Sequence, residues 1–195
     1  KCTYCYNEWR GDKKEAAALS THDLLALLDR ALTEVEFDHV TLTGGEPFAR
    51  ADLFEVLALL ERHGTRALII SNGGLITEEL ASKVATYKPY FIQVTLDGPT
   101  KELHEEHVGK GHFEPTLRGL DALKKAGVPI SGCVVVTRKN AHLVGAILEL
   151  FASYGVKESD PEVALRGLGR PWVIADPGIA LKKFPCCYAM HRGMD

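Results

Sequence analysis

Two cysteines near the start of the chain are spaced for metal or redox chemistry. Cys2 and Cys5 are separated by two residues, and Tyr4 stands directly before the second of them. Thiolates at this spacing hold zinc, hold an iron–sulfur cluster or form a redox-active disulfide. A zinc site needs two further ligands, and the next close pair, Cys186 and Cys187, lies far along the chain. The spacing alone leaves the kind of site open.

Polar and glycine-rich residues follow four short apolar runs. The runs are 40–43, 67–70, 90–96 and 130–136, and the segments after them are 44–47, 71–74, 97–99 and 137–140. Near-continuous apolar runs are typical of strands in a parallel sheet that helices cover. Since parallel strands end at one edge and ligands bind there, these segments predict a single site at that edge.

Amphipathic helices are predicted between these runs. Apolar residues recur at helical spacing over 24–35, 52–63, 77–85, 114–126 and 142–154. Ser20, with Asp23 three residues later, forms an approximate capping box before the first helix. Gly64, Gly127 and Gly155 are placed to end three of the helices. The alternation of strands and helices indicates an α/β fold with a parallel sheet, either a barrel or a doubly wound sheet.

The composition fits one globular domain. The 195-residue chain is 46% hydrophobic and 25% charged, with a formal net charge of -3. That charge attracts neither nucleic acid nor an anionic membrane, and no apolar run approaches the roughly 18 residues of a membrane span. The five cysteines do not suit a secreted disulfide framework. We therefore expect a cytoplasmic protein with no nucleic-acid and no membrane partner.

The motifs resemble those of the radical S-adenosylmethionine (SAM) superfamily over about residues 1–156. That family carries C-x-x-x-C-x-x-C with an aromatic residue before the last cysteine. Cys2 and Cys5 match the last two cysteines and Tyr4 matches the aromatic residue, whereas the first cysteine would precede Lys1. The resemblance implies a partial (β/α) TIM-like barrel of the radical SAM type, with the first strand missing and an irregular C-terminal tail.

Later segments resemble further motifs of the same family. Gly-Gly-Glu-Pro at 44–47 is similar to the motif that contacts the SAM amino group, and 71–73 and 94–98 are similar to the ends of the third and fourth strands. Segment 104–127 resembles the peptide-modifying branch, which often carries a SPASM extension.

The resemblance implies two cofactors, a [4Fe-4S] cluster and SAM. Three cysteines leave one iron open for SAM, and an electron from flavodoxin or ferredoxin cleaves its carbon–sulfur bond. The resulting 5′-deoxyadenosyl radical takes hydrogen from a peptide or small-molecule substrate, while the protein orients the cofactors. The implied cluster ligands are Cys2 and Cys5, and the implied cofactor contacts are Tyr4, Gly44, Gly45, Glu46, Pro47, Ser71, Asn72 and Thr95. Glu46 would accept a hydrogen bond from the SAM ammonium group.

Several of these residues also have a purely structural interpretation. Glu46 is placed to cap the next helix, and Ser71 and Asn72 suit a turn. Asp97 is either a cap or turn residue or a substrate contact. Cys133 lies inside an apolar run and is expected in the core.

Two histidines, His104 and His107, are three residues apart on a probable helical turn and are spaced to share a metal.

The tail has a different texture, and we place a domain boundary between 1–156 and 157–195. Residues from about 160 to 195 resemble the 2-methylcitrate dehydratase and cis-aconitate decarboxylase family, which implies carboxylate binding at Lys182 and His191. This favours a chimeric chain. The alternatives are a SPASM-like extension, in which Cys186 and Cys187 hold an auxiliary cluster, and an ordinary appendage.

The leading hypothesis is therefore a radical SAM enzyme. The alternatives are a non-catalytic fragment of a barrel and a carboxylate lyase defined by the tail.

Overall fold

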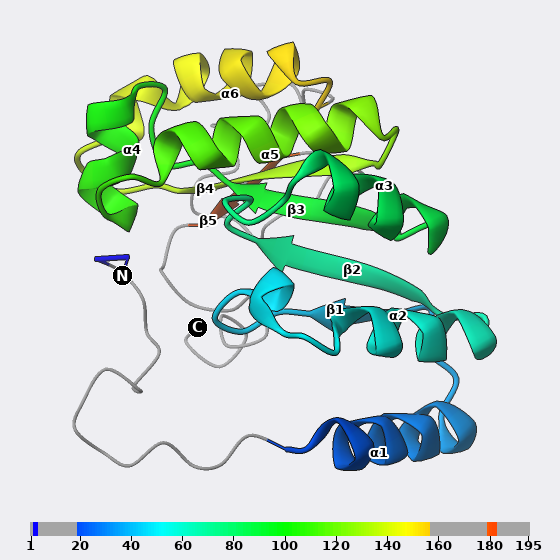
Figure 1. The fold of residues 1–195 in the computed structure, drawn as a ribbon. Helices are drawn as coiled ribbons and strands as arrows, with labels where there is room; N and C mark the ends of the chain where they lie inside the picture. The colour runs from blue at the N-terminus through cyan, green and yellow to red at the C-terminus, as the bar shows by residue number, and fades with distance from the viewer. Residues whose placement is uncertain (1, 4–18, 157–178, 183–195) are drawn as a thin grey trace.

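A parallel sheet with helices packed on it forms the described part of the protein (Figure 1). The computed structural model describes residues 2–3, 19–156 and 179–182. The sheet has five strands in the order β1-β2-β3-β4-β5. Their bounds are His39–Leu42 (β1), Arg66–Ser71 (β2), Phe91–Thr95 (β3), Ile130–Val135 (β4) and Ile179–Lys182 (β5).

The strand order decides between the two expected architectures. All four neighbouring pairs of strands are parallel, and each strand pairs with the next one in sequence. A doubly wound sheet reverses its strand order at a switch point, whereas a barrel winds in one direction. The consecutive order therefore identifies the sheet as part of a (β/α) barrel, and the predicted α/β class with a parallel sheet is confirmed.

Helix α1 (Thr21–Glu34) precedes β1, and the other helices lie between the strands in sequence. They are η2 (Pro47–Ala49), α2 (Leu53–Arg62), α3 (Glu78–Thr86), α4 (Lys101–Val108), α5 (Phe113–Lys125), η3 (Ala141–Leu143) and α6 (Val144–Ser153). The predicted cap is confirmed, because the Ser20 hydroxyl accepts a hydrogen bond from the Asp23 backbone at 3.1 Å. Gly64, Gly127 and Gly155 follow α2, α5 and α6 with positive φ. No helix of the described residues is long and apolar enough to cross a membrane.

One face of the sheet packs against the helices and forms the core. Ile69, Ile92 and Val94 are fully buried in one cluster with Leu57 of α2 and Leu123 of α5. Side chains alternate between the two faces along each strand. The neighbours of those strand residues therefore point to the other, inner face of the barrel.

The inner face carries polar side chains. Gln93 pairs in register with Ser131, and Thr95 pairs with Cys133, so these four residues share this face. Gln93 and Ser131 are buried there. Cys133 is fully buried, as expected, but it lies on the inner face and outside the cluster that packs against the helices.

Helix α4 and strand β5 were not predicted from the sequence in the form that the structure shows. The sequence indicated only a helical turn around His104, whereas α4 covers eight residues. No strand was predicted within the tail, whereas β5 pairs in parallel with β4 from Ile179 to Lys182. Cys186, Cys187 and His191 lie outside the described residues, and the boundary at residue 156 stays a prediction.

Candidate functional site

The turn after β1 leaves open space beside its backbone. Gly44 has a φ of +151°, which favours glycine, and a Cβ added at Gly44 or Gly45 would meet nothing within 4 Å. Both glycines are exposed at the carboxyl end of the strand. A ligand can therefore approach this backbone with no side chain in the way.

Glu46 joins the ends of β1 and β2. One carboxylate oxygen, Oε1, accepts hydrogen bonds from the Ser71 hydroxyl at 2.8 Å and from the Phe48 backbone at 3.2 Å. The other, Oε2, accepts one from the Asn72 backbone at 2.8 Å. Glu46 therefore has the helix-capping role that was one of its two interpretations, because its side chain caps η2. A carboxylate has about four acceptor positions, and these three donors leave one for a further donor.

Ser71 and Asn72 build the turn after β2. The Ser71 hydroxyl accepts a hydrogen bond from the Gly73 backbone at 2.9 Å, and the Asn72 side chain accepts one from the Gly74 backbone at 2.7 Å. The hydroxyl of Thr116 on α5 donates to the Asn72 carbonyl at 2.9 Å. The turn is therefore fixed both to Glu46 and to a helix.

Close packing of α5 against this turn requires a glycine. A Cβ at Gly119 would lie 2.1 Å from the Gly73 carbonyl oxygen. We expect Gly119→Ala to lower the free energy of unfolding by about 2–3 kcal/mol, because the helix must move off the turn. Gly145 of α6 is the matched control, since a Cβ there meets nothing within 4 Å. Gly145→Ala should change stability by less than about 1 kcal/mol. Urea unfolding measures the stability of both variants. Equal losses in Gly119→Ala and Gly145→Ala would contradict the close packing of α5 on the turn.

Thr95 lies apart from this group. Ser71 pairs in register with Val94, so Thr95 points to the opposite face of the sheet. It sits at the carboxyl end of β3, on the inner face with Gln93. The structure thus gathers Glu46, Ser71 and Asn72, and it places Thr95 at the same edge but on the inner side.

Asp97 and His104 fix the turn between β3 and α4. Asp97 is fully buried, and its Oδ1 accepts a hydrogen bond from the Val135 backbone at 2.8 Å. The Asp97 backbone donates to His104 Nδ1 at 3.1 Å. A Cβ at Gly98 would lie 2.5 Å from the His104 backbone nitrogen, so the helix packs directly on the turn. These contacts give Asp97 the structural role that the sequence offered as one alternative.

Burial of His104 makes stability depend on pH. Burial lowers the pKa of His104 from 6.5 to about 4, and the neighbouring His112 adds to this effect. Between pH 6.5 and about 4, His104 is therefore protonated in the unfolded chain and neutral in the folded chain. Stability is full above pH 6.5 and should fall, by on the order of 3 kcal/mol, as the pH drops towards 4.

Urea unfolding at pH 7 and pH 4.5 measures this loss. His104→Leu should flatten the dependence, whereas His142→Leu, at an exposed position, should retain it. If His104→Leu showed the same loss of stability between pH 7 and pH 4.5 as the parent protein, His104 would not be the source of the pH dependence.

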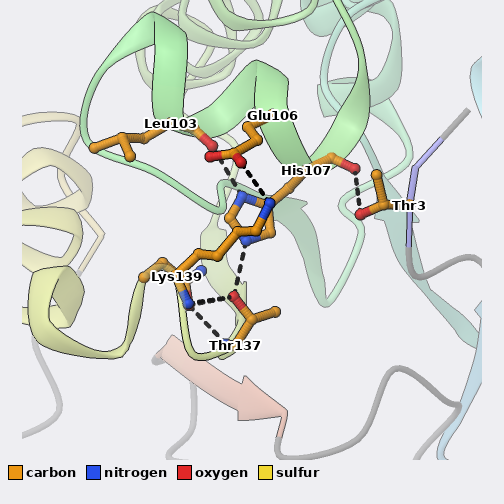
Figure 2. A network of polar contacts seen from close by, with 7 residues as sticks. Thr3, Leu103, Glu106, His107, Thr137 and Lys139 are labelled. Carbon is orange, nitrogen blue, oxygen red and sulfur yellow. Dashed lines mark hydrogen bonds and ion pairs between the residues drawn. The ribbon is translucent and has the colours of Figure 1, made fainter.

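Cys2 and Thr3 lie against the end of α4. The Thr3 backbone and hydroxyl both donate to the His107 carbonyl oxygen, at 2.7 Å and 3.2 Å (Figure 2). The ring of His107 lies 2.9 Å from the Thr137 hydroxyl in the loop after β4, so Cys2 lies at the carboxyl edge of the sheet, which also carries the Glu46 turn. Cys2 is partly buried. Tyr4 and Cys5 lie outside the described residues.

The two histidines of α4 do not face a common metal. His104 binds the Asp97 backbone, and His107 binds Leu103 and Thr137. Within the described ranges, no three His, Cys, Asp or Glu side chains gather to hold a metal ion.

Known proteins share this sequence pattern. The family model described as the radical SAM superfamily matches residues 1–151. An AdoMet-dependent heme synthase of Oleidesulfovibrio alaskensis is 36% identical over 138 residues, which cover 70% of this chain and 35% of that protein. The mycofactocin maturase MftC of Mycolicibacterium smegmatis is 32% identical over 155 residues, covering 79% of this chain and 39% of that protein. The chain thus spans well under half of these curated relatives.

Solved structures share the fold. Histidine-tagged anSMEcpe with bound AdoMet is 27% identical with a TM-score of 0.66, covering 80% of this chain and 44% of that chain. Streptococcus suis SuiB bound to the precursor peptide SuiA is 19% identical with a TM-score of 0.60, covering 76% of this chain and 34% of that one, and shares the fold alone. The cofactors of the matched family are a [4Fe-4S] cluster and SAM. The chain belongs to the radical SAM superfamily, with a mycofactocin maturase among its relatives.

Proposed function

We propose that this chain is the cofactor-binding part of an enzyme that reductively cleaves SAM at a [4Fe-4S] cluster and abstracts hydrogen from a peptide or small-molecule substrate. One observation carries the proposal. The thiol-bearing segment at Cys2 and the Glu46 turn lie at the same carboxyl edge of one parallel sheet. SAM must contact the cluster, so the residues that bind each of them have to lie at the same edge of the sheet.

The Glu46 turn suits the amino end of SAM. The remaining acceptor position of its carboxylate is fit for an ammonium group, which gives a charge-assisted hydrogen bond. Gly44 and Gly45 leave the backbone beside it uncovered. Ser71 and Asn72 hold the carboxylate in place, so little reorganisation is needed when the ligand binds.

The cysteine segment suits the cluster. Thiolates are the usual ligands of iron–sulfur clusters, and Cys2 would bind one iron and Cys5 another. When bound, the cluster and SAM supply one-electron cleavage of a carbon–sulfur bond and removal of a hydrogen atom, with flavodoxin or ferredoxin as the electron donor. The protein's own task is to hold both groups and to keep water away.

The inner face of the sheet suits a polar substrate. Gln93 and Thr95 place an amide and a hydroxyl group on the face opposite the helix core. Such groups pair well with the amides of a peptide. The structure of anSMEcpe with a bound peptide, 26% identical to this chain, and the maturase name of MftC support a peptide, whereas the heme synthase supports a small molecule.

Anaerobic reconstitution with iron and sulfide tests the proposal. The chain would carry Cys-Xaa-Xaa ahead of Lys1, which restores the C-x-x-x-C-x-x-C spacing. We expect a brown chromophore and 5′-deoxyadenosine release from SAM after reduction with dithionite. Cys2→Ser should abolish both, whereas Cys133→Ala, at a thiol buried in β4, should retain both. Full chromophore in Cys2→Ser would overturn the proposal.

A further inference from the structure

We propose that His107 is a positioning residue that holds Cys2 and Thr3 at the sheet edge by fastening the end of α4 to the loop after β4. The inference rests on the proposed function only in calling these two residues part of a cluster loop. It assigns a role to a histidine that the cofactor motifs leave unused.

Cys2 and Thr3 are attached to the carboxyl end of α4 through hydrogen bonds of Thr3. Thr3, the residue after Cys2, directs both its backbone N–H and its hydroxyl at the His107 carbonyl oxygen, at 2.7 Å and 3.2 Å. The last carbonyls of a helix have no partner within the helix, so this oxygen is available to a neighbouring segment. The position of Cys2 therefore follows the position of the last turn of α4.

The ring of His107 connects that turn to the loop after β4 (Figure 2). Its Nδ1 lies 2.9 Å from the Leu103 carbonyl oxygen, and its Nε2 lies 2.9 Å from the Thr137 hydroxyl. A carbonyl oxygen only accepts, so Nδ1 carries the proton. The Nε2 of that tautomer accepts from the Thr137 hydroxyl, whose other contact, to Asn140 Oδ1, is longer at 3.3 Å. His107 is buried, at 3% exposure, so water competes little for these bonds.

Thr137 is itself held firmly. Its backbone donates to the Asn140 side chain at 2.7 Å, and the Asn140 amide donates to the Asp97 and Val135 carbonyls at 2.9 Å and 3.0 Å. The Asp97 carbonyl lies just after the end of β3, and the Val135 carbonyl belongs to the last residue of β4. The chain of contacts from Thr3 through His107 thus reaches the ends of two strands.

Helix α4 needs this support because it is short. Eight residues form a marginal helix without tertiary contacts. On its solvent side, Lys139 and Glu106 also form an ion pair, but both are exposed, and such pairs contribute little. The buried His107 bridge is therefore the stronger link between the end of α4 and the loop after β4.

The direct test uses the chain without a cluster. Amide hydrogen exchange at Thr3 reports the hydrogen bond to His107, and urea unfolding reports global stability. His107→Phe keeps the ring volume and removes both ring bonds. We expect Thr3 exchange to become about 5- to 10-fold faster in this variant under conditions where the chain stays folded. His107→Gln, which can still accept from Thr137, should restore most of the protection.

His104→Phe is the matched control. It changes a buried histidine of the same helix that faces the core and binds the Asp97 backbone instead of Thr137. This variant should lose stability but keep Thr3 protected. Thr3 protection that is unchanged in His107→Phe, or lost equally in His104→Phe, would overturn the inference.

Reconstituted protein gives a second readout. With the Cys-Xaa-Xaa extension, His107→Phe should lose iron to a chelator about 5- to 10-fold faster than the parent, and His104→Phe should match the parent. If no variant takes up iron, the proposed function fails, while the exchange measurement still decides the role of His107.

Discussion

Replacing Glu46 with glutamine should weaken SAM binding by about 10- to 100-fold, because a hydrogen bond to a charged group contributes about 1.5–3 kcal/mol. Glutamine retains one acceptor oxygen, which can still serve the Ser71 hydroxyl and the Phe48 backbone. Its NH2 group would then face the Asn72 N–H, which is also a donor. The substitution thus removes the charge and misplaces the turn. Equilibrium dialysis with labelled SAM on reconstituted protein measures the loss.

Glu55→Gln provides the control for this prediction. Glu55 is an exposed carboxylate in the first turn of α2, so its loss removes the same charge at a site away from the Glu46 turn. We expect unchanged SAM affinity in this variant. Equal affinity in Glu46→Gln and Glu55→Gln would show that the turn does not bind SAM.

Asn140→Asp should cause the largest loss of stability. Asn140 is fully buried, and its amide donates to the carbonyls of Asp97 and Val135. Aspartate keeps the shape and the acceptor for the Thr137 backbone, but it turns an oxygen towards two carbonyl oxygens. Unsatisfied buried groups cost about 1–3 kcal/mol each, so we expect a loss of about 3–5 kcal/mol in urea unfolding.

The neighbouring Lys139→Met variant tests whether this loss is specific. The Lys139 side chain is exposed and pairs with Glu106 at the surface. Surface pairs contribute at most about 1 kcal/mol. If Asn140→Asp were no less stable than Lys139→Met, the buried amide would not be the link between the ends of β3 and β4.

The sequence located the turns at the carboxyl edge of the sheet because local residue types mark them. Glycines and polar residues after apolar runs placed the Glu46 and Asn72 turns correctly, and Cys133 was correctly expected to be buried. These are local features, set by the residue types and by the alternation of strands and helices. The radical SAM resemblance was confirmed by the family match over residues 1–151.

Contacts between distant segments were beyond the sequence. Nothing in the spacing indicates that Glu46 would bind Ser71 and Asn72, which are 25 and 26 residues away. The pair Thr3 and His107 is separated by 104 residues. Helix α4 was largely missed because it has few apolar residues, and its buried face instead includes His104 and His107. The choice of barrel over doubly wound sheet needed the strand order, which local patterns do not encode.

The central claim is that the cysteine segment and the Glu46 turn hold a cluster and SAM in contact at one edge of the sheet. Electron paramagnetic resonance of the reduced, reconstituted protein with and without SAM tests it most directly. We expect SAM to change the spectrum of the parent protein and, at the same concentration, to leave that of Glu46→Gln unchanged. A fully loaded cluster whose spectrum does not respond to saturating SAM in the parent protein would contradict the claim.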